Sequence, residues 1–252
     1  MDASSHTAPG SGLTRAGQFF FKYRDLLFPL VFLPIALGTR PAVLLGDPRA
    51  DGGMQALGVL VVLAGQGLRA LVIGLAYIRR GGKNRQIYAQ DLVQDGFFAH
   101  SRNPLYVGNL LIVAGLVLIH GGPWMYLLVL PFFLFVYIAI VAAEELYLST
   151  HFGSQYAEYC RKVPRFLPRL RGLAATIRGM DFDWKRLVRK EYGTFFSSVN
   201  GVLLLLAWKY VSVHGFDASR KLLWTLGLVW IPFLLAYLTA RVLKKRGTLG
   251  KG

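Results

Sequence analysis

Long runs of mainly apolar residues are the feature that most constrains the fold of this chain. Apolar side chains account for 54% of its 252 residues and charged side chains for only 17%, which argues against a water-soluble fold. A helix needs about 20 apolar residues to cross the hydrocarbon core of a bilayer. The runs that approach or reach this length are residues 26–45, 54–78, 105–119, 124–143, 199–211 and 222–243. We therefore predict an all-α integral membrane protein with about six transmembrane helices.

Basic residues are concentrated on one side of the predicted membrane. The formal net charge is +16, and if the N-terminus is cytoplasmic the inner connections hold 23 of the 29 Lys and Arg residues. This positive-inside pattern predicts that both termini are cytoplasmic. A basic chain can also bind nucleic acid, but the sequence contains no soluble basic domain that would do so. We expect the charge to contact anionic lipid headgroups instead.

The composition divides the chain into four segments. These are a disordered cytoplasmic tail (residues 1–17), a membrane core (18–170), a basic interfacial segment (171–197) and a C-terminal transmembrane hairpin (198–252). Residues 182–192 have the pattern of an amphipathic helix that lies on the membrane surface. Cys160 is the only cysteine and the five histidines show no metal-ligand spacing, so neither an internal disulfide nor a metal site is expected. The oligomeric state stays open.

The segment GFFAHSRNPLYVG, residues 96–108, places polar and aromatic residues at the start of the third run. Pro104 is favoured in the first turn of a helix, and Asn103 before it is a candidate cap. The free backbone N–H groups of such a helix start can hold a carboxylate or a phosphate. Phe98 and Tyr106 could offer aromatic faces to a flat or cationic ligand. An ordinary helix cap with interfacial aromatics would explain the same residues.

Two carboxylates, Glu144 and Glu145, follow the fourth run at the same membrane face. Negative charge near a helix C-terminus opposes the macrodipole, so the pair is not placed there for helix stability. The carboxylates are candidates for binding ligand hydroxyl or ammonium groups, and the alternative is that they reach water or pair with Arg161 or Arg165. Gly153 is predicted to break the helix. Residues 154–168 would then fold back beneath the hairpin as a lid, or form an interfacial belt of Tyr and Arg.

Arg69 lies deep within the second run. A charge inside the membrane is costly and indicates a functional role by default. A substrate headgroup and Glu144 are its candidate partners, and snorkelling towards the membrane surface is the alternative. Residues 65–70 fit the pattern G-x-G-x-x-A, but a dinucleotide site needs a preceding strand, which a membrane helix does not provide. We therefore exclude that site.

Three motifs occur in a fixed order along the chain. They are Arg102-Asn103-Pro104-Leu105-Tyr106-x-Gly108, Glu144-Glu145, and Phe152-Gly153-x-x-Tyr156-x-x-Tyr159 with a closing Val163-Pro164-Arg165. Their order, spacing and membrane placement resemble the isoprenylcysteine carboxyl methyltransferases and phospholipid N-methyltransferases, over residues 55–168. The resemblance implies S-adenosyl-L-methionine as methyl donor, held in a cytoplasmic pocket beneath the hairpin. By motif position it implies the following contacts to this cofactor: Gln90, Asp91, Leu92, Val93, Phe98, Asn103, Pro104, Leu105, Tyr106 and Glu144.

The sequence departs from this family on the acceptor side. Enzymes that methylate an isoprenylcysteine carboxylate carry an arginine one turn before the cofactor-binding glutamate, and Ile140 occupies that position here. Arg102 and Arg69 are the candidate replacements near the acceptor. An amine acceptor must lose a proton before it attacks, and Glu145 or His100 could assist. We predict methyl transfer to a lipid-like acceptor, either an isoprenoid carboxylate or a phospholipid amine.

Two other functions fit parts of the same pattern. A membrane reductase that uses NADPH on an isoprenoid or sterol-like lipid would share a related C-terminal architecture. A non-catalytic membrane protein could retain the fold without the activity. The C-terminal hairpin lies outside the resemblance, and it could be an added anchor, an oligomer contact or a wall of the substrate site. The expected location is a bacterial inner membrane.

Overall fold

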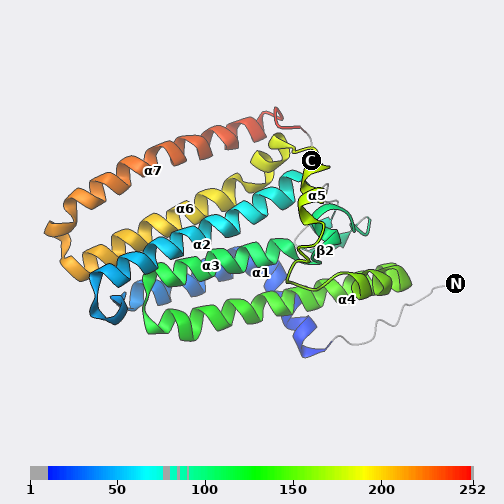
Figure 1. Cartoon of the computed structure of the whole chain (residues 1–252), viewed down its shortest axis with the longest axis horizontal. Coiled ribbons are helices and arrows are strands. Elements are labelled where there is room, and N and C mark those ends of the chain that lie inside the picture. The colour runs from blue at the N-terminus through cyan, green and yellow to red at the C-terminus, as the bar shows by residue number, and fades with distance from the viewer. Residues whose placement is uncertain (1–10, 76–79, 84–85, 90, 251–252) are drawn as a thin grey trace.

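Six long helices form the frame of the molecule. The computed structural model describes residues 11–75, 80–83, 86–89 and 91–250. The long helices are α1 (Gly12–Gly38), α2 (Pro48–Leu75), α3 (Pro104–His120), α4 (Leu130–Lys162), α6 (Trp184–His214) and α7 (Phe216–Lys245). They lie along the longest axis of the molecule, and each runs opposite to the one before it (Figure 1). Each contains one of the predicted apolar runs or most of it.

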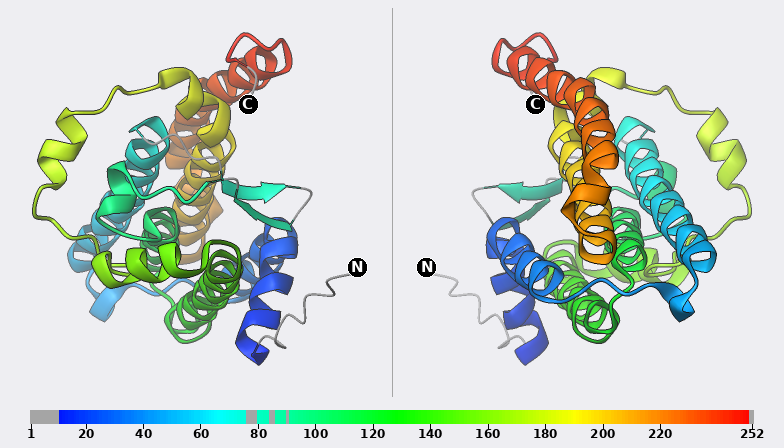
Figure 2. Two further views of the ribbon diagram at one scale, coloured as in Figure 1. Left: turned by 90° about the vertical axis from the view of Figure 1, so that its right-hand side faces the viewer. Right: turned by 90° about the vertical axis from the view of Figure 1, so that its left-hand side faces the viewer.

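Shorter elements close the two ends of this bundle. At one end lie the antiparallel strands β1 (Arg80–Lys83) and β2 (Gln86–Ala89), the short helix η2 (Gly96–Ala99) and α5 (Leu173–Arg178). At the other end lie η1 (Leu44–Gly46) and the π-helical turn η3 (Met125–Val129). The end with β1, β2 and α5 also contains the start of α1 and the end of α7 (Figures 1 and 2).

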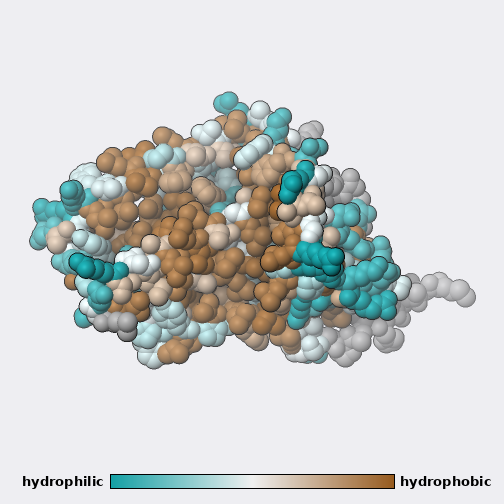
Figure 3. All heavy atoms as spheres, in the orientation of Figure 1, coloured by the Kyte–Doolittle hydropathy of each residue, from teal (hydrophilic) through white to brown (hydrophobic). Residues whose placement is uncertain are grey.

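The outer surface of the helices is apolar, as expected for a protein surrounded by lipid. Among the described residues, α2, η3 with α4, α6 and α7 are long and apolar enough to cross a membrane, and α3 is apolar but shorter. Figure 3 shows a broad hydrophobic band over the middle of the bundle and hydrophilic residues towards its two ends. The prediction of an all-α integral membrane protein is confirmed, with the small β1–β2 ribbon as an addition.

The helices α2 and α3 are in direct backbone contact through glycines. A Cβ atom added to Gly58 would lie 2.7 Å from the carbonyl oxygen of Gly115, and one added to Gly65 would lie 2.6 Å from that of Gly108. Both helices therefore place glycines seven residues apart on the contact face, and the antiparallel pairing matches them one to one. Small residues are the usual means by which membrane helices approach closely.

Replacing Gly65 with Leu is expected to lower the free energy of unfolding by about 1–3 kcal/mol, the usual cost of overpacking. Gly67 lies on the same helix, and none of the described atoms comes within 4 Å of its Cβ position, so Gly67→Leu is the matched control. Thermal unfolding of both variants in detergent measures the difference. Equal melting temperatures would contradict the close contact between α2 and α3.

Two predicted segment boundaries are wrong. Residues 182–192 do not form a separate surface helix, because α6 runs without interruption from Trp184 to His214. Asp183 caps this helix, and its side chain accepts a hydrogen bond from the backbone N–H of Arg186 at 2.8 Å. The predicted disordered tail is also too long, since α1 begins at Gly12. The basic stretch is thus the first part of a membrane helix, in which Lys185 and Lys190 are exposed while Glu191 pairs with Arg69 inside the bundle.

The two helices of the central hairpin diverge. Although α3 and α4 are consecutive long helices, α3 packs mainly on α2, and α4 packs mainly on α1. The helix α6 packs on α2, α3 and α7, and α7 lies outermost on α6 (Figure 2). This arrangement leaves a space between α1, α3, α4 and α6.

Candidate functional site: an amphipathic cavity

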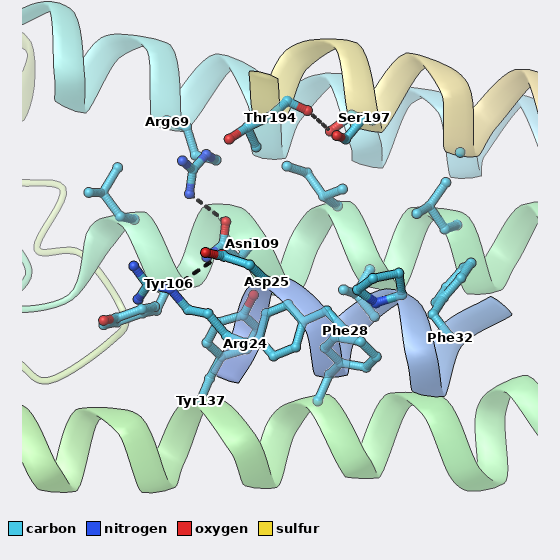
Figure 4. Close-up of a pocket in the computed structure, with 18 of the residues that line it drawn as sticks. Arg24, Asp25, Phe28, Phe32, Arg69, Tyr106, Asn109, Tyr137, Thr194 and Ser197 are labelled. Atoms are coloured by element: carbon cyan, nitrogen blue, oxygen red, sulfur yellow. Dashed lines mark hydrogen bonds and ion pairs between the residues drawn. The ribbon is translucent and has the colours of Figure 1, made fainter. Parts of the chain in front are cut away.

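A cavity of about 890 Å³ lies in this space (Figure 4). Its size is within the range of small-molecule sites, about 300–1,000 Å³. The polar residues that line it lie near the end of the bundle with β2 and α5, and they include Arg24, Asp25, Tyr106, Asn109, Glu144 and Thr194. Further along the same four helices the lining is mainly apolar, with Phe28, Phe32, Ile112, Leu116, Phe133 and Leu204, although Asn200 also contributes to it. The cavity can therefore hold a polar group at one end and an apolar chain along the rest of its length.

The polar end joins the two predicted halves of the ligand site. Tyr106 lies in the first turn of α3, and its hydroxyl donates a hydrogen bond of 2.6 Å to the carboxylate of Glu144 on α4. The ring of Tyr106 lies beside that of Tyr137, with the ring centroids 5.5 Å apart. One carboxylate and two aromatic rings thus converge on one wall of the cavity.

The motif from Arg102 to Tyr106, at the start of α3, contributes further lining residues. Phe98, Asn103, Pro104 and Leu105 all line the cavity, and Pro104 is the first residue of α3, as predicted. The side chain of Asn103 does not cap the helix. It donates a hydrogen bond of 3.0 Å to the backbone oxygen of Arg165, because the segment after α4 brings that carbonyl against it. Asn103 therefore ties the start of α3 to this segment.

The segment after Gly153 holds the loop before α3 in place. Gly153 has φ +51° and ψ −121°, so it interrupts α4 as predicted. Beyond it, the Tyr159 hydroxyl donates to the backbone oxygen of Phe98 at 2.7 Å. The backbone N–H of Arg102 donates to the oxygen of Pro164 at 2.9 Å. The segment does fold back, and it clamps the loop that carries Phe98.

Arg102 and Glu145, two predicted catalytic residues, do not line the cavity. Their side chains pair with each other at 2.9 Å, and Glu145 also pairs with Arg165 at 2.8 Å. Burial acts to lower the pKa of Arg102, but the neighbouring Glu145 carboxylate raises it, and the net shift is upward. This ion pair joins the loop before α3 to α4. The alternative of pairing with Arg165 is confirmed for Glu145.

His100, the other candidate base, is also placed outside the cavity lining. Its Nδ1 lies 2.7 Å from the backbone oxygen of Arg169, and its Nε2 lies 2.9 Å from the hydroxyl of Thr176. Both ring nitrogens are therefore engaged in holding the segment that leads to α5.

Arg69, the third predicted catalytic residue, does line the cavity, but its predicted pairing with Glu144 is wrong. Its guanidinium donates to both carboxylate oxygens of Glu191 on α6, at 2.6 and 2.9 Å. It also donates to the side-chain oxygen of Asn109 on α3. The charge is thus neutralised inside the bundle, so the arginine has no need to reach the membrane surface.

Of the predicted cofactor run before Gly96, the described residues Asp91, Leu92 and Val93 do not line the cavity. Leu92 packs with Leu148, Tyr156 and Tyr159 in one apolar cluster, and Val93 packs with Val72, Phe97 and Phe98 in another. Asp91 is exposed at the surface. Gln90 lies outside the described residues.

Several cavity residues were not singled out from the sequence. They are the α1 side chains Arg24, Asp25, Phe28 and Phe32, the helix residues Asn109 and Tyr137, and the α6 residues Thr194, Ser197 and Ser198. A signal existed for two of them. Asn109 follows Tyr106 by three positions and Tyr137 precedes Glu144 by seven, so each shares a helix face with a predicted site residue.

The position where the resemblance expects an arginine is occupied by a fully buried apolar side chain. Ile140 is 0% exposed and belongs to the main apolar cluster of the bundle. An acceptor carboxylate would therefore find no cation at this point of α4.

Comparisons with known proteins agree with the motifs. Residues 54–155 match the model of the phospholipid methyltransferase family. The chain is 29% identical over 172 residues to the cobalt-zinc-cadmium resistance protein CzcN of Cupriavidus metallidurans. The matched residues make up 67% of this chain and 75% of the relative. No solved structure matches at a significant level. The segment that carries α2, α3 and most of α4, and with them Tyr106 and Glu144, is thus similar in sequence to the phospholipid methyltransferase family, which the motifs also resemble.

Proposed function

We propose that this chain transfers a methyl group from S-adenosylmethionine to a lipid-like acceptor. The observation that carries the proposal is the Tyr106–Glu144 pair, 2.6 Å apart, at the polar end of an amphipathic cavity. Both residues lie within the segment that matches a methyltransferase family. A polar compartment suits the donor, and the apolar continuation suits a lipid acceptor.

The residues at the polar end fit S-adenosylmethionine. The donor carries an ammonium group, a sulfonium and a flat adenine ring, and the cavity offers the Glu144 carboxylate together with the rings of Phe98, Tyr106 and Tyr137. A carboxylate attracts the cationic groups, and aromatic faces stabilise both cations and flat rings. Asn103, Pro104 and Leu105 would line the same end. When bound, the sulfonium supplies an activated methyl group.

The chain's own residues orient and shield the reaction. The clamp by the segment after Gly153 fixes the loop with Phe98, and the Tyr106 hydroxyl fixes the carboxylate of Glu144. Precise placement of two reactants supplies a large part of the acceleration of such a transfer. The apolar walls formed by Ile112 and Phe133 exclude water from the path between the two compartments.

The acceptor would come from the bilayer through the gap between α1 and α6. Leu33 on α1 and Leu204 on α6 line the cavity, yet they are 44% and 61% exposed, respectively. Exposed apolar side chains at a cavity rim in a membrane protein face lipid chains. A lipid can thus place its chain along this rim and its headgroup towards Tyr106. We place the protein in a bacterial inner membrane with both termini in the cytoplasm, in accordance with the charge distribution.

Two measurements test the proposal. Isothermal calorimetry on the detergent-solubilised protein is expected to detect binding of S-adenosylmethionine and no binding of NADPH. Incubation with radiolabelled S-adenosylmethionine and a total bacterial lipid extract is expected to label a lipid band. Binding of NADPH alone would favour a membrane reductase, and binding of neither would favour a non-catalytic protein.

A further inference from the structure

The helix α6 lies outside the segment that matches the family, yet it forms one whole wall of the cavity. Its lining residues are Gly193, Thr194, Phe196, Ser197, Ser198, Asn200, Gly201 and Leu204. Most of them recur every three or four positions, which is the spacing of a single helix face. The hydroxyl groups of Thr194, Ser197 and Ser198 lie in the half of this face near the polar end. The part of α6 from Ser198 onwards belongs to the C-terminal hairpin, for which a wall of the substrate site was one of three expected roles.

A chain of polar contacts anchors this wall to the family core. The Ser198 hydroxyl donates to the side-chain oxygen of Gln66 at 3.3 Å, and the Gln66 amide donates to Glu191 at 3.5 Å. Glu191 then receives the two hydrogen bonds from Arg69, which also contacts Asn109 at the cavity (Figure 4). The network therefore crosses from α6 to α2 and α3 at the level where the polar end of the cavity begins.

Glu191 determines whether the positive charge of Arg69 is compensated beside the polar end of the cavity. The side chains of Arg69 and Glu191 are only 11% and 5% exposed, so both charges are largely removed from water and each needs the other. Glu191 is the only acidic residue between Asp183 and Asp217. Without its carboxylate, a guanidinium with an uncompensated charge would face the cavity.

The other charged residues of the lining do not restore a positive field. Arg24 lies next to Asp25 on α1, with 4.0 Å between their charged groups, and Glu144 adds a negative charge. With Arg69 neutralised, the described lining carries no net positive charge. An anionic headgroup would therefore be repelled at the polar end, and an uncharged or cationic one would not.

We propose that Glu191 sets the charge selectivity of the cavity by neutralising Arg69, so that the α6 wall accepts amphiphiles with an uncharged or cationic headgroup and rejects anionic ones. That this amphiphile is the methyl acceptor rests on the proposed function, whereas the charge selectivity does not. Glu191 acts here through Arg69 and is a positioning residue.

The test uses three ligands with the same chain: oleyl alcohol, oleylamine and oleyl phosphate. Their binding to the full-length protein in nanodiscs of uncharged lipid is measured without S-adenosylmethionine, by displacement of a fluorescent fatty alcohol. The wild-type protein is expected to prefer the alcohol and the amine. Glu191→Gln is expected to raise the affinity for oleyl phosphate relative to oleyl alcohol roughly tenfold, since one unpaired charge then faces the ligand. Glu191→Asp should retain the wild-type preference.

A second pair of variants distinguishes a change in headgroup preference from a simple loss of folding. Arg69→Gln leaves the carboxylate unpaired and should shift the preference towards oleylamine, the opposite direction from Glu191→Gln. The double variant Arg69→Gln/Glu191→Gln should restore the wild-type order. Asp217→Asn removes an exposed carboxylate of the same hairpin and serves as the control. Headgroup preferences that are equal in all folded variants would overturn the proposal. Loss of S-adenosylmethionine binding would bear only on the proposed function.

Discussion

Replacing Glu144 with Gln is expected to weaken the binding of S-adenosylmethionine about 100-fold, which corresponds to about 3 kcal/mol. Gln keeps the size of the side chain but removes the negative charge that would face the cationic donor. The Tyr106 hydroxyl, which donates to this carboxylate at 2.6 Å, would still find an oxygen to bond. The loss should therefore come from ligand binding and leave the fold intact. Calorimetry in detergent gives the affinity, and the melting temperature reports the fold.

Two control variants separate the effect of the Glu144 charge on binding from the effects of neighbouring groups. Tyr106→Phe removes the hydroxyl that orients Glu144 and is expected to weaken binding by about tenfold, because only a single hydrogen bond is lost. Glu158→Gln makes the same change on the same helix, but Glu158 lies exposed and pairs with Lys162. It should bind S-adenosylmethionine as the wild-type protein does. An unchanged affinity in Glu144→Gln would contradict the assignment of the donor to this end of the cavity.

Replacing Lys209 with Met is expected to lower the free energy of unfolding by about 3–5 kcal/mol, the typical cost of breaking a buried ion pair. The Lys209 ammonium donates to Asp51 at 2.6 Å and to the backbone oxygen of Ile119 at 3.1 Å. Lys209 and Asp51 are 3% and 7% exposed, respectively. The pair joins α6 to the start of α2 at the end of the bundle opposite the polar part of the cavity. Its loss leaves a buried carboxylate whose remaining partners include Gln55.

A double-mutant cycle checks this coupling. Asp51→Asn alone should also destabilise the protein, whereas Asp51→Asn/Lys209→Met should cost less than the sum of the single changes. Arg220→Met, which breaks the exposed pair with Asp217, is the surface control and should cost at most about 1 kcal/mol. Thermal unfolding in detergent provides the comparison. Strictly additive losses would mean that the two charges do not stabilise each other.

Local features of this chain could be predicted because each depends on neighbouring residues. Pro104 begins α3, in agreement with the preference of proline for the first helical turn, and Gly121 ends it with φ +73°. Gly153 interrupts α4 at the expected place. The placement of Tyr106 and Glu144 at one membrane face also followed from the hairpin, because its two ends lie on the same side of the bilayer.

The wrong predictions depend on contacts that are remote in sequence. Residues 182–192 have the charge pattern of a surface helix, but they form the first part of α6, because Glu191 pairs inside the bundle with Arg69, 122 positions earlier. Arg102 and Glu145 share the predicted membrane face, yet they pair with each other and leave the cavity to Tyr106 and Glu144. No local periodicity distinguishes a charge that meets a ligand from one that meets another helix.

The apolar runs, the turns between them and the motif residues from Asn103 to Glu144 can be recognised in the sequence alone. They follow from hydrophobicity, from the backbone preferences of Pro and Gly, and from residue order. That α1 and α6 complete the cavity, and that Glu191 cancels the charge of Arg69, is visible only in the folded chain. The reason is physical: a buried charge must be compensated, and the partner that compensates it is chosen by helix packing across the whole chain.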